Sequence, residues 1–230
     1  MRYWPALIAL VTTLPAPASA GVLLDVDFEQ MSPGSPVAVG GPIVGRAGGD
    51  LSGAITTRIE RHDDSNWLAI GDNDEYAAGA VRFEGGQGRG YLNGEVAFSA
   101  DLYFDPISEG STFFVYVREA GSSASTFLSL TFSDTGNISL SDQNTPHKAI
   151  ATYGDRTGRP LPLDLVFDME ALTYDVWLDG ELVVEAERHG IEEVGVGSIL
   201  FGTAHDADYE GVLYVDNVMM THERADRLLW

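Results

Sequence analysis

The sequence predicts an all-β protein, an antiparallel jelly-roll sandwich of two sheets. Short segments alternate apolar and polar residues with the period of two that half-buried strands show. The segments between them are rich in Gly, Asp, Asn and Ser, which is typical of turns. Helical periodicity is nearly absent, and many antiparallel strands without intervening helices pack as a sandwich or jelly roll.

The first 20 residues have the features of a secretory signal. Arg2 is followed by an apolar stretch over residues 4–14 and by the small residues and prolines of 15–20. We expect cleavage near Ala20 and export to the periplasm or the medium. The apolar stretch is too short to span a bilayer, so no membrane insertion is predicted.

Predicted strands follow along the rest of the chain. In residues 95–105, Val96, Phe98 and Leu102 share one parity while Ser99 and Asp101 share the other. Two turns are also predicted, at 133–137 and at Asp179-Gly180, since Asp-Gly between alternating segments is a strong hairpin signal. The predicted strands are 22–29, 54–61, 95–105, 112–119, 126–132, 163–169, 173–178, 181–186, 198–203 and 211–220. Only 187–194 and the residues after Thr221 are compatible with a helical turn, and Trp67 is predicted to lie in the core.

Length and composition predict a single folded domain over residues 21–222, followed by a tail at 223–230. A chain of 230 residues with 44% hydrophobic residues is long and apolar enough for one core, and too apolar for a disordered chain. The sequence contains no cysteine, so no disulfide stabilises the fold, and a bound cation is one alternative source of stability.

The charge excludes several partners. Asp and Glu number 35 against 13 Lys and Arg, a net charge of -22. Such a polyanion is repelled by nucleic acids and by anionic membranes. If the ligand is a carbohydrate, this charge predicts a neutral one.

Two passages resemble a known superfamily. Residues 163–184, LDLVFDMEALTYDVWLDGELVV, resemble the strand, turn, strand and Asp-Gly hairpin of concanavalin A-like, laminin G-like jelly rolls. Residues 211–218, GVLYVDNV, resemble their closing strand, which pairs with an opening strand like residues 25–29. The resemblance implies a concanavalin A-like fold, in a superfamily of lectins, carbohydrate-binding modules, glycoside hydrolases, polysaccharide lyases and adhesion domains. A galactose-binding-like jelly roll is the second choice of fold.

Acidic residues form two candidate metal clusters. Asp25, Asp27 and Glu29 share one face of the first predicted strand, and their D-x-D-x-E spacing resembles the E-x-D-x-E strand of β-glucanases. The first position is Asp rather than Glu and the motif is not in mid-chain, so an acidic surface or half of a cation site is the favoured interpretation. The run 206–211 begins like a calcium loop, but its twelfth position is Asn217 and a strand follows, which excludes an EF-hand. A structural Ca²⁺ is therefore hypothesised, with ligands drawn from Asp27, Glu29, Asp206, Asp208, Glu210 and Asp216.

Aromatic side chains on polar strand faces are the candidate ligand-binding residues. Trp177 and Asp175 share one face of their strand, and Phe114, Tyr116 and Arg118 share one face of theirs. An aromatic ring beside carboxylate or guanidinium groups suits the apolar faces and hydroxyls of a sugar. We predict one binding platform from these side chains; the alternative is that they pack between the sheets or beneath a loop.

The leading functional hypothesis is an exported, non-catalytic carbohydrate-binding or adhesion-type protein. One alternative is a glycoside hydrolase or polysaccharide lyase of the same fold that uses Asp27 and Glu29; another is a structural envelope or matrix protein without a small ligand. Cysteine nucleophiles are impossible, G-x-S-x-G is absent, and no basic cleft for lyase chemistry is evident from the sequence.

Overall fold

The computed structural model describes residues 21–37, 39–47, 57–62, 64–72, 79–85, 90–104, 112–120, 126–154, 158–192, 194–203 and 211–223, and in 45–47 and 72 the backbone alone. The predicted secretory signal at 1–20 and most of the predicted tail lie outside these residues. The described chain forms strands β1 to β15 in two antiparallel sheets, which confirms the predicted fold. Among the described residues there is no helix long and apolar enough to cross a membrane.

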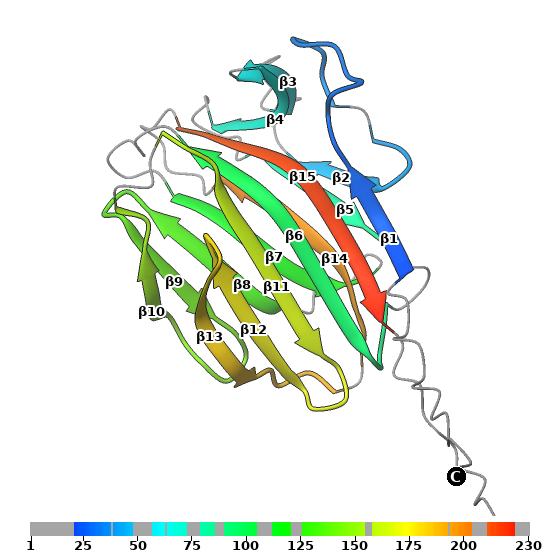
Figure 1. Ribbon diagram of the computed structural model, residues 1–230, viewed down its shortest axis with the longest axis vertical. Coiled ribbons are helices and arrows are strands. Elements are labelled where there is room, and N and C mark those ends of the chain that lie inside the picture. Colours follow the sequence, from blue (N-terminus) through cyan, green and yellow to red (C-terminus); the bar gives the residue numbers. More distant parts are fainter. Residues whose placement is uncertain are drawn as a thin grey trace, which may run out of the picture.

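The eight-stranded sheet, here called the β6 sheet, lies at the front in Figure 1. Its strand order is β13-β12-β11-β6-β15-β4-β3, and β1 pairs with β15. The strands are β1 (Gly21–Val26), β3 (Thr57–His62), β4 (Ser65–Asp72), β6 (Glu95–Phe104), β11 (Leu161–Asp168), β12 (Thr173–Leu178), β13 (Glu181–Arg188) and β15 (Gly211–Glu223). The pairing of β1 with β15 is the one that the resemblance implies.

The seven-stranded β7 sheet lies behind it, in the order β10-β9-β8-β7-β14-β5-β2. Its strands are β2 (Ile43–Ala47), β5 (Ala80–Glu84), β7 (Thr112–Glu119), β8 (Thr126–Ser133), β9 (Asn137–Ser141), β10 (Lys148–Thr152) and β14 (Val196–Thr203). Strand β7 lies between β8 and β14 and therefore occupies the interior of this sheet.

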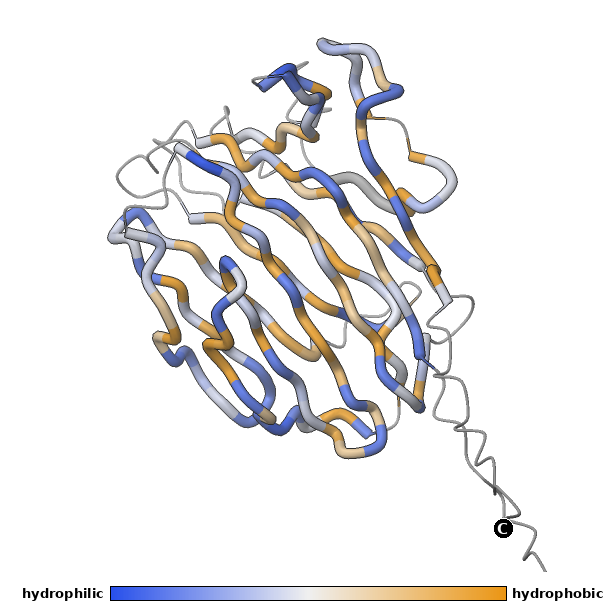
Figure 2. The backbone as a smooth tube through the Cα atoms, viewed as in Figure 1, coloured by the Kyte–Doolittle hydropathy of each residue, from blue (hydrophilic) through white to orange (hydrophobic). Residues whose placement is uncertain are grey.

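The core fills the space between the sheets. Apolar and polar residues alternate along most strands in Figure 2, and the apolar set faces inward. Phenylalanines from both sheets meet there: Phe104 of β6 lies 6.2 Å from Phe113 of β7 and 5.8 Å from Phe132 of β8, measured between ring centroids. Burial of each such side chain stabilises the fold by about 1.5–3 kcal/mol.

Turn chemistry also follows the prediction. Asp179 and Gly180 have φ of 55° and 75°, the positive values that a two-residue hairpin with this twist needs, and they connect β12 to β13. Gly136, with φ of 82°, closes the turn from β8 to β9 through its N–H bond to the Ser133 carbonyl.

Several sequence predictions need correction. Strand β15 runs to Glu223, so the helical turn predicted after Thr221 is strand as far as the described residues extend. Strand β1 ends at Val26 rather than at 29, although exposed and buried side chains keep alternating through Glu29. The first part of the predicted helical turn at 187–194 is strand, because β13 extends to Arg188. Trp67 is buried, but its ring packs outside the core, against His62 and Tyr103 on the outer side of the β6 sheet.

Candidate functional site

The outer face of the β7 sheet, here called the β7 face, carries rows of side chains that cross the strands. Tyr116 of β7 lies between Leu200 of β14 and Ser129 of β8, and Ser129 is paired with Ser141 of β9. One step along the sheet, Phe114 lies between Gly202 and Thr131, which is paired with Ser139. The face therefore combines two aromatic rings with the hydroxyl groups of neighbouring serine and threonine side chains.

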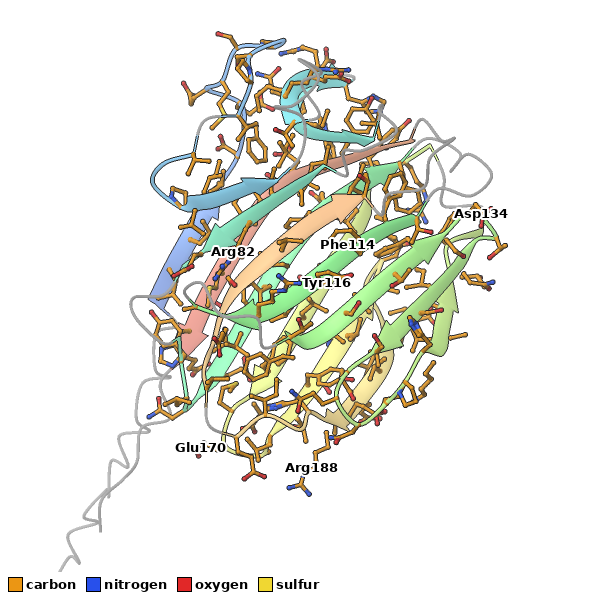
Figure 3. The ribbon with its side chains drawn as sticks, turned by 180° about the vertical axis from the view of Figure 1, so that it is seen from behind. Arg82, Phe114, Tyr116, Asp134, Glu170 and Arg188 are labelled. Carbon is orange, nitrogen blue, oxygen red and sulfur yellow. The ribbon has the colours of Figure 1, made fainter. Side chains whose placement is uncertain are left out.

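Phe114, Tyr116 and Arg118 form a stack along β7. All three side chains are partly exposed, while Phe113, Val115 and Val117 are buried, as predicted from their alternation. The Phe114 and Tyr116 rings stack at 4.4 Å with 16° between their planes, and the Arg118 guanidinium lies 4.9 Å from the Tyr116 centroid. Figure 3 shows Phe114 and Tyr116 side by side on this face. Because its neighbours come from two residues before and two residues after it, Tyr116 is held between them.

Gly202 makes room for the first ring of the stack. A Cβ atom built on Gly202 would lie 2.5 Å from Cζ of Phe114 and 2.7 Å from its Cε2 atom. These distances are too short for non-bonded carbons, so the ring tip of Phe114 occupies the space that any other residue would fill. This role could not be predicted from the sequence, because it depends on the pairing of β7 with β14.

Arg82 adds a second cation, whose hydrogen bonds are satisfied within the protein. Its Nη2 donates to Oε2 of Glu84 at 3.1 Å and to the Glu119 carbonyl at 3.2 Å, and its Nε donates to Oγ of Ser198 at 3.2 Å. Alternation in β5 places Arg82 and Glu84 opposite the buried Val81 and Phe83, which would have identified them as outward-facing.

The two sheets differ in charge. The strands of the β6 sheet contain thirteen Asp and Glu and three Arg, whereas those of the β7 sheet contain two Glu, three Arg and one Lys. Strands β8, β9 and β14 contain no charged residue at all. Among the residues of the strands, the acids are therefore concentrated in the β6 sheet, and the strands on either side of β7 contain none.

Trp177 and Asp175 lie on the opposite side of the molecule. Both are partly exposed on β12, as their alternation predicts, and Trp177 is paired with Asp164 of β11 on the outer face of the β6 sheet, here called the β6 face. Since β7 and β12 belong to different sheets, the predicted platform divides into two sites. Sequence alternation identified outward-facing side chains but did not show which face each one occupies.

Two of the predicted metal ligands meet at Ser65 near the β15 bulge. Oγ of Ser65 hydrogen-bonds with Glu29 and lies 3.2 Å from Oδ2 of Asp216. The hydrogen bonds from Ser65 and from the Asn66 N–H lower the pKa of Glu29, whereas burial raises the pKa of Asp216. Ser65 has a single hydroxyl proton, so it can donate to only one of these two carboxylates at a time.

The calcium hypothesis stays a prediction. Asp27 is exposed and accepts the Glu29 N–H at 3.3 Å, whereas Asp206, Asp208 and Glu210 lie outside the described residues. Within the described part of the chain, no three Asp, Glu or His side chains gather as a metal site would require.

A cluster of four rings on the β6 face was not predicted. His62 lies 3.9 Å from Tyr103 and 5.6 Å from Tyr214, and Trp67 lies 6.3 Å from Tyr103, between ring centroids. The Tyr214 hydroxyl also bonds to Oε2 of Glu60 at 3.0 Å. Trp67 and Tyr103 are each only 6% exposed, so we interpret this cluster as packing around β3 and β4.

No protein-family model matches the sequence, and no curated protein matches it. Solved structures do match the fold. A sialidase matches with a TM-score of 0.62 and 14% identity over 91% of this chain, which spans only 19% of that protein. A carbohydrate esterase from Shiga toxin-encoding bacteriophage phi24B matches with a TM-score of 0.60 and 10% identity, over 89% of this chain and 100% of that one.

Alginate lyase AlyC3, in complex with dimannuronate, matches with a TM-score of 0.56 and 9% identity, over 77% of this chain and 89% of the lyase. At these identities the similarity shows a shared β-sandwich fold and leaves the chemistry to the residues of this chain.

Proposed function

We propose that this protein binds carbohydrate through the β7 face, as an exported, non-catalytic binding or adhesion protein. The observation that carries the proposal is the stack of Phe114, Tyr116 and Arg118. These partly exposed side chains lie on the outer face of a central strand of the sheet. A sugar presents hydroxyls and apolar C–H groups together, and a face of this kind offers a partner for each.

The surroundings of the stack favour a polar ligand of extended shape. Serine and threonine side chains line β8 and β9 beside it, at Ser129, Thr131, Ser139 and Ser141. Each hydroxyl both donates and accepts a hydrogen bond, as the hydroxyls of a sugar chain do. The fold neighbours named above, a sialidase, an alginate lyase and a carbohydrate esterase, support the same broad class of ligand.

Substitution on opposite faces tests the proposal. The mature protein and its Tyr116→Ala and Trp177→Ala variants are applied to an array of neutral and acidic glycans, with circular dichroism to confirm folding. We expect Tyr116→Ala to weaken binding about tenfold, a loss of about 1.4 kcal/mol, and Trp177→Ala to bind like the wild type.

Three outcomes would contradict the proposal. Binding that depends on Trp177 and not on Tyr116 would move the site to the β6 face, and a folded wild type that binds no glycan would favour a structural role. Release of new reducing ends from bound glycans, abolished by Glu29→Gln, would instead establish the hydrolase alternative.

A further inference from the structure

Arg118 differs from the other arginines of the described chain. The remaining arginine side chains each have a hydrogen-bond or ion-pair partner: Arg58 with Glu60, Arg61 with Asn66, Arg82 with Glu84, Arg159 with Asp179 and Arg188 with Glu192. Within the described residues, Arg118 has the Tyr116 ring as its neighbour and no acceptor, although its Nε atom is buried. A buried donor without an acceptor is costly, and no carboxylate of the described residues pairs with this guanidinium. Because the Arg118 side chain is partly exposed, its remaining N–H groups can meet an acceptor from outside the chain.

The stretches of sequence that follow β7 and β5 contain no carboxylate, and Glu192, which precedes β14, is paired with Arg188. Residues 120–133, which follow β7 and include β8, contain no charged residue, and residues 85–94, which follow β5, contain Arg89 and no acid. Glu119 is the next residue along β7, but its side chain points inward and is buried. Glu84 is already paired with Arg82.

The distant acids do not cancel this local charge. Packed sheets lie about 10 Å apart, and the Debye length is about 8 Å at physiological ionic strength. The outward side chains of the β6 face lie farther from Arg118 than the spacing of the sheets, so salt in the surrounding solvent weakens their effect at the β7 face. The whole-chain charge, which predicted a neutral ligand, is not the charge that a ligand meets beside Arg118.

We infer that the glycan bound at the β7 face carries a carboxylate that pairs with the Arg118 guanidinium. A planar guanidinium binds a carboxylate through two parallel N–H···O bonds, and stacking on Tyr116 holds that plane in place. Tyr116 and Ser129 remain beside it for the hydroxyls of the same sugar. This inference rests on the proposed function and revises the expected ligand from neutral to acidic sugar.

A pair of polymers that differ only at the carboxylate provides the test. Polymannuronate and its carboxyl-reduced, neutral counterpart are titrated into the wild type, Arg118→Gln, Arg118→Lys and Tyr116→Ala by isothermal calorimetry at two salt concentrations. We expect the wild type to prefer the acidic polymer at least tenfold, and Arg118→Gln to lose that preference while keeping its binding to the neutral polymer. Arg118→Lys keeps part of the preference, because it retains the charge without the two-bond geometry.

The outcomes separate this inference from the proposed function. Equal binding of both polymers, with loss in Tyr116→Ala, would overturn the carboxylate inference and leave carbohydrate binding intact. An acidic preference that survives Arg118→Gln would assign it to another residue and also overturn the inference. If no glycan binds, a sialylated oligosaccharide included, both the carboxylate inference and the proposed function are overturned. If the wild type prefers the sialylated oligosaccharide to polymannuronate and Arg118→Gln loses that preference, the carboxylate inference is confirmed and the ligand is a terminal acidic sugar.

Discussion

The β6 face and the β7 face of the sandwich cover the same core, yet they handle charge in opposite ways. On the β6 face several carboxylates disfavour one another: burial and the charge of Asp101 raise the pKa of Asp164, and burial and Glu223 raise the pKa of Glu95. Among the described strands of the β7 sheet, Glu84 is the one acid that faces outward, and it is paired with Arg82. Like charges therefore repel one another on the β6 face, whereas these strands of the β7 face carry few acids.

This difference shows that a net charge describes solubility better than it describes a binding site. Acids concentrated on one side are expected to favour solubility and to repel nucleic acid from that side. The described residues of the other side present aromatic rings, hydroxyls and the Arg118 guanidinium, which has no acceptor among them. The predictions below test the two faces separately, beginning with the largest expected effect.

The ring stack on the β7 face depends on Gly202. We expect Gly202→Ala to lower stability by about 1–3 kcal/mol and the Tm by roughly 2–10 °C, because the new Cβ would displace Phe114 and approach the Gly79 carbonyl to 2.9 Å. Thermal unfolding measures the loss. In a Phe114→Ala background the same change is expected to cost less, and an equal cost in both backgrounds would show that the ring does not need the glycine.

His189 lies between the sheets and belongs to neither face. It is 1% exposed, its ring centroid lies 5.3 Å from that of Phe127 on β8 and 6.3 Å from that of Phe167 on β11, and neither ring nitrogen makes a well-aligned hydrogen bond. Burial lowers its pKa; a weak interaction with the Ile191 backbone and the charges of Asp142 and Glu192 only partly offset this effect, and Arg188 reinforces it. As pH falls below about 6.5, His189 takes up a proton in the unfolded chain more readily than in the folded chain, so the free energy of unfolding decreases.

His189→Leu removes this pH dependence. We expect the variant to be more stable than the wild type by about 1 kcal/mol at pH 7.5, because the unpaired ring nitrogens are gone, and by more at pH 5.5. Thermal unfolding at both pH values provides the measurement, with His222→Gln as a control at a partly exposed histidine. An unchanged gap between the two pH values would show that His189 does not titrate in this way.

Alternation along single strands was enough to predict which side chains face outward. Phe114, Tyr116 and Arg118 on β7, and Asp175 and Trp177 on β12, point as predicted, because the period of two is a local property of an extended chain. The hairpin at Asp179-Gly180 is equally local, since two positive φ values define it.

Membership of a sheet is a different kind of information. Whether β7 and β12 share a face depends on pairings between strands far apart in the sequence, such as β7 with β14 and β11 with β6. The space for Phe114 at Gly202 and the separation of charge between the faces follow from those pairings. Alternation in the sequence therefore identified the outward-facing side chains but not the division of the predicted platform into two.

Asp164 and Asp168 on β11 test how the cost of a negative charge on the β6 face depends on position. Asp164 has a raised pKa from burial first and Asp101 second, so we expect Asp164→Asn to stabilise the protein at pH 7 by about 0.5 kcal/mol, or 1–2 °C in Tm. A group whose pKa is raised by folding weakens the fold above that pKa and stops doing so as pH falls toward the unfolded value. The gain is therefore expected to disappear in acid.

Asp168, on the same strand, is the matched control. Its Oδ1 accepts the N–H groups of Glu170 and Ala171 at 2.9 and 2.8 Å, so Asp168→Ala is expected to destabilise the turn by about 1 kcal/mol. Opposite signs for the two variants at pH 7 would confirm that the cost of charge on this face is specific to position. Destabilisation by both would mean that Asp164 makes a favourable interaction.

Calcium would act on the β6 face alone, where Glu29 and Asp216 meet at Ser65. A divalent cation there relieves the repulsion that Glu29 adds to the burial of Asp216. If Ca²⁺ is present at a concentration equal to its Kd, linkage stabilises the fold by about 0.4 kcal/mol, which raises the Tm by about 1 °C relative to chelator. Asp216→Asn is expected to abolish that response, whereas Tyr116→Ala on the β7 face retains it. A Tm that is the same in millimolar Ca²⁺ and in chelator would refute the calcium proposal and leave the hydrogen bonds of Ser65 as the interaction that joins these carboxylates.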